Sequence, residues 1–508
     1  MSGANESDLS SLVSSASLML VGGTLGSSSK LVERVVIARV LSQSAYGEVA
    51  LGISVMSLST TVALVGLDTG IARYMSRLKT SREVRGVWVT GLIISLVVSV
   101  VLAALLLVGG SWIVGLLFEQ PGSRELLTLF VLAIPFGVGF RIAIGAIRGL
   151  ENTIYRTYAR DLFYNGVRLG LIVALLLAGV GVSSAGYAYL FAGVATFVLA
   201  HLLLNRLLSL RGEITIRPKQ LLLFSIPLVL SAMTSKLLGE VDTLMLGYFR
   251  TTAEVGVYDA AYQLAAGLPA LMSSFGFLYM PLTSRLDAEG NHEEINSIYK
   301  VTTKWVYIAG FPIFLVFVGF SADVVALFFG ETYAEGGTAL WIIATGFFVS
   351  AAYGRAQDTL AAFGHTRVIL WINVIAAVLN VLLNAVLIPR YGFLGAAMAT
   401  ALSFATLNGL AFAILWNSFG ITPFSRWSTR TFVLLPLVLI PPVLLVSRTV
   451  TLSLVLFPLS GVLAGLATLG VVALTGCLQP EDEIPVELVE NRLDVAIPVI
   501  RRFIPADD

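Results

Sequence analysis

The chain has 508 residues, of which 57% are hydrophobic and 12% charged, and its mean hydropathy is +0.88. A soluble fold cannot bury so much apolar surface, so the composition excludes a water-soluble protein and indicates an integral membrane protein. The formal net charge of +1 gives no general attraction to nucleic acid, and the single cysteine, Cys477, excludes an internal disulfide.

Apolar runs of about 20 residues recur along the chain, which is the length that an α-helix needs to cross a bilayer. The runs do not alternate with period two, so they do not predict a β-barrel. The first residues carry Glu6 and Asp8 and no basic run, so we expect no cleaved signal peptide. The predicted fold is an all-α polytopic membrane protein with about fourteen transmembrane helices. In chain order these are residues 14–40, 45–67, 86–109, 126–149, 158–179, 184–207, 220–248, 255–281, 301–321, 336–358, 367–388, 393–416, 431–447 and 452–477.

Two segments of the chain, residues 33–78 and 240–286, resemble each other. Gly47 corresponds approximately to Gly256 and Tyr46 to Tyr258. Six helices precede residue 210 and six lie between 211 and 420, so both halves begin and end on the same side of the membrane. The pattern predicts two parallel six-helix repeats, 1–210 and 211–420, followed by two additional helices within 421–477 and a cytoplasmic tail, 478–508.

Basic residues concentrate in the loops that follow even-numbered predicted helices, as in the loop with Arg73, Arg77 and Arg82. The odd-numbered loops after the first helix hold few basic residues and several acidic ones. Because cytoplasmic loops carry the excess of Lys and Arg, the pattern predicts that both termini are cytoplasmic and that the protein resides in the cell membrane.

Several ionisable residues lie inside the predicted helices, where each one costs about 2.5–3.5 kcal/mol on insertion scales. Such residues indicate a water-filled cavity or close pairing. We interpret four cations as candidate binding groups for an anionic substrate: Lys30, Arg34, Arg141 and Lys236. We interpret four carboxylates as candidate sites for ion coupling, with H⁺ or Na⁺ as the ion: Glu33, Glu240, Asp242 and Asp259.

A purely structural interpretation stays open for these charges. Lys30 with Glu33, and Lys236 with Glu240, have the spacing of ion pairs within one helix. Arg168 is expected to extend its side chain to the membrane interface, and Arg355 is expected to pair with Asp358. The three histidines form no metal-binding pattern, and we find no nucleophile or phosphate-loop motif, so neither an enzyme nor a cofactor is predicted.

Three stretches resemble one known family. They are residues 22–47 (GGTLGSSSKLVERVVIARVLSQSAYG), residues 241–286 (beginning VDTLMLGYF) and residues 331–403 (beginning ETYAEGG). They are similar to the polysaccharide and lipid-linked oligosaccharide flippases of the multidrug/oligosaccharidyl-lipid/polysaccharide exporter superfamily. The resemblance covers nearly the whole chain up to about residue 416 and implies a V-shaped transporter of two lobes. The family's cavity-facing cations on the first helix carry over to Lys30 and Arg34.

The resemblance implies a flippase that moves a polyprenyl- or dolichol-phosphate-linked saccharide from the cytoplasmic to the outer leaflet by alternating access, for assembly of cell-surface polysaccharide or glycoprotein. The expected partners are this substrate and membrane lipids, with glycan-assembly enzymes as further candidates and no nucleic acid. A cation-coupled drug antiporter of the same superfamily is the alternative. A scaffold for a cell-envelope complex that transports nothing is a third possibility.

Overall fold

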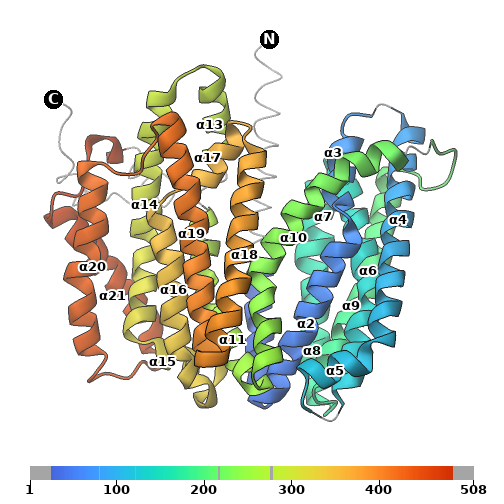
Figure 1. Cartoon of the computed structure of the whole chain (residues 1–508), viewed down its shortest axis with the longest axis horizontal. Helices are drawn as coiled ribbons and strands as arrows, with labels where there is room; N and C mark the ends of the chain where they lie inside the picture. Colours follow the sequence, from blue (N-terminus) through green and yellow to red (C-terminus); the bar gives the residue numbers. More distant parts are fainter. Residues whose placement is uncertain (1–24, 79, 121, 216–217, 275–278, 484–508) are drawn as a thin grey trace. The chain divides into compact units, whose positions relative to one another are not determined.

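The computed structural model describes residues 25–78, 80–120, 122–215, 218–274 and 279–483 (Figure 1). The described residues form helices and their connections and contain no β-strand. This confirms the all-α fold class predicted from hydropathy. The predicted helix residues 14–24 and the tail residues 484–508 lie outside the described residues.

The first described helix covers residues 25–40. The helices that follow it up to residue 265 are α2 (Gln43–Leu64), α3 (Leu67–Met75), α4 (Ser81–Val108), α5 (Gly110–Leu117), α6 (Ser123–Gly149), α7 (Thr153–Arg156), the π-helix η1 (Thr157–Phe163), α8 (Tyr164–Leu177), α9 (Ser183–Leu207), α10 (Pro218–Phe249) and α11 (Thr252–Ala265).

The remaining helices are α12 (Gly267–Ser274), α13 (Tyr279–Ala288), α14 (His292–Gly319), α15 (Ser321–Phe329), the 3₁₀ helix η2 (Glu331–Gly336), α16 (Gly337–Ala352), α17 (Ala356–Ala362), α18 (Thr366–Tyr391), α19 (Phe393–Phe419), α20 (Arg426–Val446), α21 (Leu456–Leu474) and the 3₁₀ turn η3 (Pro480–Asp482).

Within the described ranges, ten helices are long and apolar enough to cross a membrane. They are α2, α4, α6, α9, α14, η2 with α16, α18, α19, α20 and α21. Four further predicted spans correspond to residues 25–40, to α7 through α8, to α10, and to α11 with α12. The total of fourteen spans, the two repeats and the division at residues 210 and 420 stay predictions.

Polar residues placed just before several helices explain where those helices begin. The side chain of Ser42 accepts a hydrogen bond from the Ala45 amide at 3.3 Å, and that of Asn291 accepts one from the Glu294 amide at 3.2 Å. At α20 the side chain of Ser425 accepts from the Ser428 amide at 3.1 Å. These caps satisfy amides that have no partner within the helix.

By their contacts the described residues form two compact units. The first extends to Asp259 and includes Asn384–Phe393. Its core lies around α6, which packs against α2, α3, α4 and α9. Helices α6 and α3 approach closely because Gly145 has no side chain. A Cβ added to Gly145 would lie 2.5 Å from the Asp68 carbonyl oxygen. In the same unit, α10 packs against α2 and α3.

The second unit comprises Ala260–Leu383 and the chain from Leu394 onward. Its core lies around α14, which packs against α16, α20 and α21. Aromatic side chains fill this core: the Phe314 and Phe348 rings stack with centroids 4.2 Å apart, and Tyr307 lies 4.3 Å from Phe348. The two C-terminal helices are therefore built into the packing of this unit through α14.

The two glycines that correspond in the sequence, Gly47 and Gly256, lie against each other where α2 meets the start of α11. A Cβ on Gly47 would lie 1.8 Å from the Thr252 carbonyl oxygen and 2.9 Å from the Gly256 amide nitrogen. Hydroxyls reinforce the contact, because Ser44 and Thr252 share a hydrogen bond. Only residues without a side chain permit two helices to approach this closely.

We predict that Gly47→Ala lowers the thermal midpoint of the detergent-solubilised protein, because the new methyl group must push α11 away from α2. Overpacking of this kind costs about 1–3 kcal/mol. Gly170→Ala is the matched control, since a Cβ there meets nothing within 4 Å. An equal midpoint for the two variants would contradict the proposed packing.

Candidate functional site

Charged and polar side chains form several groups within the first unit, and the first is centred on Glu33. Its carboxylate accepts hydrogen bonds from the Arg168 guanidinium at 2.6 Å and from the Tyr189 hydroxyl at 2.8 Å. Glu33 is 1% exposed and Arg168 is 4% exposed. These contacts join residues 25–40, α8 and α9.

Aromatic rings enclose the Arg168 guanidinium, whose central carbon lies 4.8 Å from the Tyr164 ring centroid and 4.5 Å from that of Tyr189. Such stacking stabilises a cation that has left water. The expectation that Arg168 extends to the membrane interface is therefore wrong. A buried carboxylate on another helix holds it, and Glu33 pairs with it rather than with Lys30.

The second group joins residues 25–40 to α2 and α11. Arg34 Nη1 lies 3.2 Å from Asp259 Oδ2, and both side chains are almost buried. The Tyr46 hydroxyl also donates to Asp259. Arg34 was predicted to bind substrate and Asp259 to couple an ion, so the structure joins one residue from each predicted set.

Asp242, on α10, lies in the same unit and is also buried. Its carboxylate accepts hydrogen bonds from the Tyr258 hydroxyl at 2.9 Å and from the Asn384 amide at 2.5 Å. Hydrogen bonds from neighbouring donors stabilise the charged form of a buried carboxylate. These two contacts join α10 to α11 and α18.

The third group is the pair expected from spacing. Lys236 Nζ lies 3.1 Å from Glu240 Oε1, one turn along α10. The Ser54 hydroxyl donates to the other Glu240 oxygen at 2.8 Å, linking α10 to α2. The Lys236 side chain is 39% exposed, so the pair is only partly buried.

Two of the predicted cations lack an acidic partner in the described part of the chain, and we call them the open cations. Among the residues that the structure describes, neither Lys30 nor Arg141 has an acidic side chain within 4.0 Å. The positive charges of Arg168, Arg160, Lys236 and Arg141 all act on Lys30. Arg141 is repelled by Arg160 and attracted by Asp68. The arrangement concentrates positive charge that an anionic ligand would neutralise.

The open and the paired charges lie at different depths along their helices. Lys30 precedes Arg34 by one turn, roughly 6 Å along the axis. Arg141 precedes Gly145 by one turn, and Gly145 packs against Asp68 at the start of α3. α3 leads into the basic loop that is predicted to be cytoplasmic. The open cations therefore lie nearer that loop than Arg34 and Asp259 do.

The predicted residues are grouped in part as expected, but several of their partners were missed. Arg160, Tyr189, Tyr46 and Asn384 were not identified from the sequence. A signal existed for the tyrosines, because polar aromatic residues in otherwise apolar helices need a hydrogen-bond partner. The described residues contain no group of three or more metal-binding side chains.

The sequence profile of the polysaccharide biosynthesis protein family matches residues 36–336, more than half of the chain. The chain belongs to this family. Its long apolar helices make it a multi-pass membrane protein, and the resemblance to the family of polysaccharide and lipid-linked oligosaccharide flippases is confirmed.

Two relatives from Haloferax volcanii carry flippase names. The "Probable low-salt glycan biosynthesis flippase Agl15" is 26% identical over 191 residues, which is 38% of this chain and 40% of the relative. The "Probable flippase AglR" is 26% identical over 320 residues, 60% of this chain and 63% of the relative. The chain thus spans less than two thirds of the length of these curated relatives.

A solved structure shares the fold at low sequence identity. The lipid II flippase MurJ in its inward closed conformation matches with a TM-score of 0.72 and 13% identity, over 88% of this chain and 97% of that one. The likeness shows that the chain shares the fold of that protein.

We predict that Arg168→Met strongly destabilises the protein, because it leaves Glu33 buried without its counter-charge. Breaking a buried pair costs about 3–5 kcal/mol. Adding Glu33→Gln to that variant should recover much of the loss, as measured by thermal unfolding in detergent. Arg285→Ala is the control, since the Arg285–Glu289 pair is exposed. A double variant no more stable than Arg168→Met alone would contradict the pairing.

Proposed function

We propose that this transporter carries a polyprenyl- or dolichol-phosphate-linked saccharide from the cytoplasmic to the outer leaflet of the cell membrane. Cell-surface polysaccharide or glycoprotein assembly would consume the product. The proposal rests on positive charges on apolar helices. Lys30 and Arg141 have no acidic side chain within 4.0 Å among the described residues, and Lys236 is 39% exposed. A phosphate is the part of such a substrate that these groups would bind.

The proposed binding begins at the end of the first unit nearer the predicted cytoplasmic loops. Lys30 and Arg141 would neutralise the phosphate as it leaves water, and Lys236 would join them by releasing part of its contact with Glu240. The lipid chain would stay in the bilayer. Alternating access of the two predicted six-helix lobes, 1–210 and 211–420, would then expose the saccharide on the other side.

Support for this assignment comes from what the other cations do. Arg34 is held by Asp259 and Arg168 by Glu33, so binding a phosphate there would first require breaking a buried ion pair. Binding of a phosphate to Lys30 and Arg141 requires no ion pair to break. We therefore assign Lys30 and Arg141 to the substrate and give Arg34 a different role.

We propose that Arg34 and Asp259 form the ion-coupling element, with H⁺ or Na⁺ as the ion. A proton or Na⁺ on Asp259 would weaken its attraction to Arg34 and its hydrogen bond from Tyr46. Those contacts join residues 25–40 and α2 to α11, so their loss would loosen the start of α11. Glu33, Glu240 and Asp242 are the remaining candidates for the coupling site.

The proposal makes this protein a transporter without an enzymatic step or a bound cofactor. Glycan-assembly enzymes on either side of the membrane are its proposed partners, since they must supply the lipid-linked saccharide and use it. Both chain termini are proposed to be cytoplasmic.

Lys30→Gln combined with Arg141→Gln should lower the rate of transport of a polyprenyl-phosphate-linked saccharide in proteoliposomes by at least about tenfold. Each lost charge-assisted hydrogen bond is worth about 1.5–3 kcal/mol. The thermal midpoint should not fall, because neither side chain holds an ion pair. Arg124→Gln with Arg206→Gln is the matched control, since both arginines are exposed.

Transport of the saccharide at the wild-type rate by the Lys30 and Arg141 variant would exclude the site assignment. Transport of a cationic dye with no transport of the saccharide would instead favour a cation-coupled drug antiporter. Loss of co-purifying envelope proteins without any change in flux would favour a scaffold.

Asp259→Asn should uncouple transport from the ion gradient, because an amide neither titrates nor binds Na⁺ with a full negative charge. The measurement is the saccharide transport rate with and without an imposed pH or Na⁺ gradient. Glu213→Gln is the control, since Glu213 is 80% exposed. If the Asp259 variant keeps the wild-type gradient dependence, coupling resides elsewhere or is absent.

A further inference from the structure

A separate pocket with basic and apolar lining lies in the second unit, at the beginning of α20. It is lined by residues from the end of the preceding loop and the first turns of the helix. These are Phe424, Ser425, Arg426, Thr429, Arg430, Val433 and Leu434. No residue of this pocket belongs to the proposed substrate or coupling site.

Two arginines supply the charge of the pocket. Arg426 and Arg430 are four residues apart, so they lie on one face of α20. Both are exposed, and neither has an acidic partner within 4.0 Å among the residues that the structure describes. Arg430 Nη1 reaches the Gly476 carbonyl oxygen at 3.5 Å, which directs this side chain toward the end of α21.

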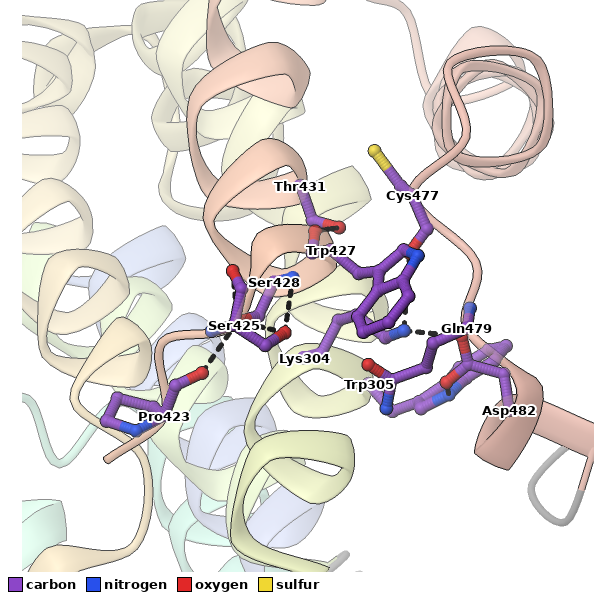
Figure 2. Close-up of polar contacts among 10 residues, drawn as sticks. All are labelled: Lys304, Trp305, Pro423, Ser425, Trp427, Ser428, Thr431, Cys477, Gln479 and Asp482. Atoms are coloured by element: carbon purple, nitrogen blue, oxygen red, sulfur yellow. Dashed lines mark hydrogen bonds and ion pairs between the residues drawn. The ribbon is translucent and has the colours of Figure 1, made fainter. Parts of the chain in front are cut away.

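One of the acidic residues that follow α21, Asp482, is already paired with another residue. Asp482 forms a fully buried ion pair with Lys304 of α14 (Figure 2). The Gln479 backbone amide donates a hydrogen bond at 2.8 Å to the Asp482 oxygen that pairs with Lys304, Oδ2, and the Trp305 indole donates one at 2.8 Å to the other oxygen, Oδ1. Asp482 therefore neutralises Lys304 and forms no ion pair with Arg426 or Arg430.

An apolar stripe continues from the arginines along the same face of α20. Val433 and Leu437 follow Arg430 at helical spacing, and they are 57% and 66% exposed. In a helix that crosses a membrane, this face contacts lipid. The face thus presents two cations at the helix start and an apolar surface beyond them, which matches a molecule with an anionic head and a hydrocarbon chain.

We propose that this pocket binds the headgroup phosphate of an anionic bilayer phospholipid, whose acyl chain lies along Val433 and Leu437. The two guanidinium groups provide forked donors for the phosphate oxygens. A free phosphate would use the arginines but not the stripe. A zwitterionic lipid would leave the two positive charges only partly balanced. The complete pattern therefore favours an anionic phospholipid.

The test is native mass spectrometry of the full chain in detergent, titrated with dioleoyl phosphatidylglycerol. Arg426→Gln with Arg430→Gln should weaken binding of one phosphatidylglycerol on the order of tenfold or more. Arg430→Gln alone, which keeps one cation, should give an intermediate affinity and provides the test if the double variant does not fold. Dioleoyl phosphatidylcholine should bind weakly to the wild type and should not distinguish the variants.

The matched control is Arg73→Gln with Arg77→Gln, which removes two exposed arginines at the same spacing from the end of another helix, α3. An equal loss in this control would show bulk attraction and overturn the proposal, as would unchanged binding in the Arg426 and Arg430 variants. Displacement of phosphatidylglycerol by inorganic phosphate would indicate a free-anion site. Preferential displacement by a polyprenyl phosphate would indicate a substrate-lipid site, and either outcome would overturn the proposal.

Discussion

The cost of placing a charge in an apolar medium determines how this chain is arranged. A membrane-embedded carboxylate or guanidinium needs an opposite charge, several hydrogen bonds or water. In the first unit, Glu33 meets this need with Arg168 and Tyr189, and Asp259 meets it with Arg34 and Tyr46. Each carboxylate draws its partners from two other helices, so the same contacts that neutralise charge also determine which helices are neighbours. In the second unit, the buried pair of Lys304 and Asp482 attaches the segment after α21 to α14.

This constraint separates the intramembrane cations into two kinds, which the sequence alone could not do. The Lys236–Glu240 and Arg355–Asp358 pairs were expected from their spacing of four and three residues, and both are present. The partners of Arg168 and Arg34 lie 135 and 225 residues away along the chain, and no local pattern indicates such a distance. For that reason Arg168 was wrongly expected at an interface, and Arg34 was grouped with Lys30 although their environments differ.

The fold was predictable to the extent that hydropathy determines it. The apolar runs identified the helices, because a membrane requires each spanning segment to satisfy its own backbone. Departures from ideal helix were not predictable, since they depend on neighbours. One such departure is the π-helix Thr157–Phe163, which carries Arg160 and leads into α8 with Arg168, all within one predicted span. Likewise, the sequence indicated that Gly47 and Gly256 correspond, but not that their backbones lie in contact.

The division between open and paired charges also bears on how transport could be coupled. A ligand shifts a conformational equilibrium only through a difference in affinity between the two states. If an anionic head group binds Lys30 and Arg141, its free energy acts on α6 and the residue 25–40 helix, whereas an ion on Asp259 acts on the contact between that helix and α11. Lys30 and Arg34 lie one turn apart on one helix. A movement of this helix would therefore displace both Lys30 and Arg34. Substrate binding and ion binding could then change each other's affinity although no residue contacts both.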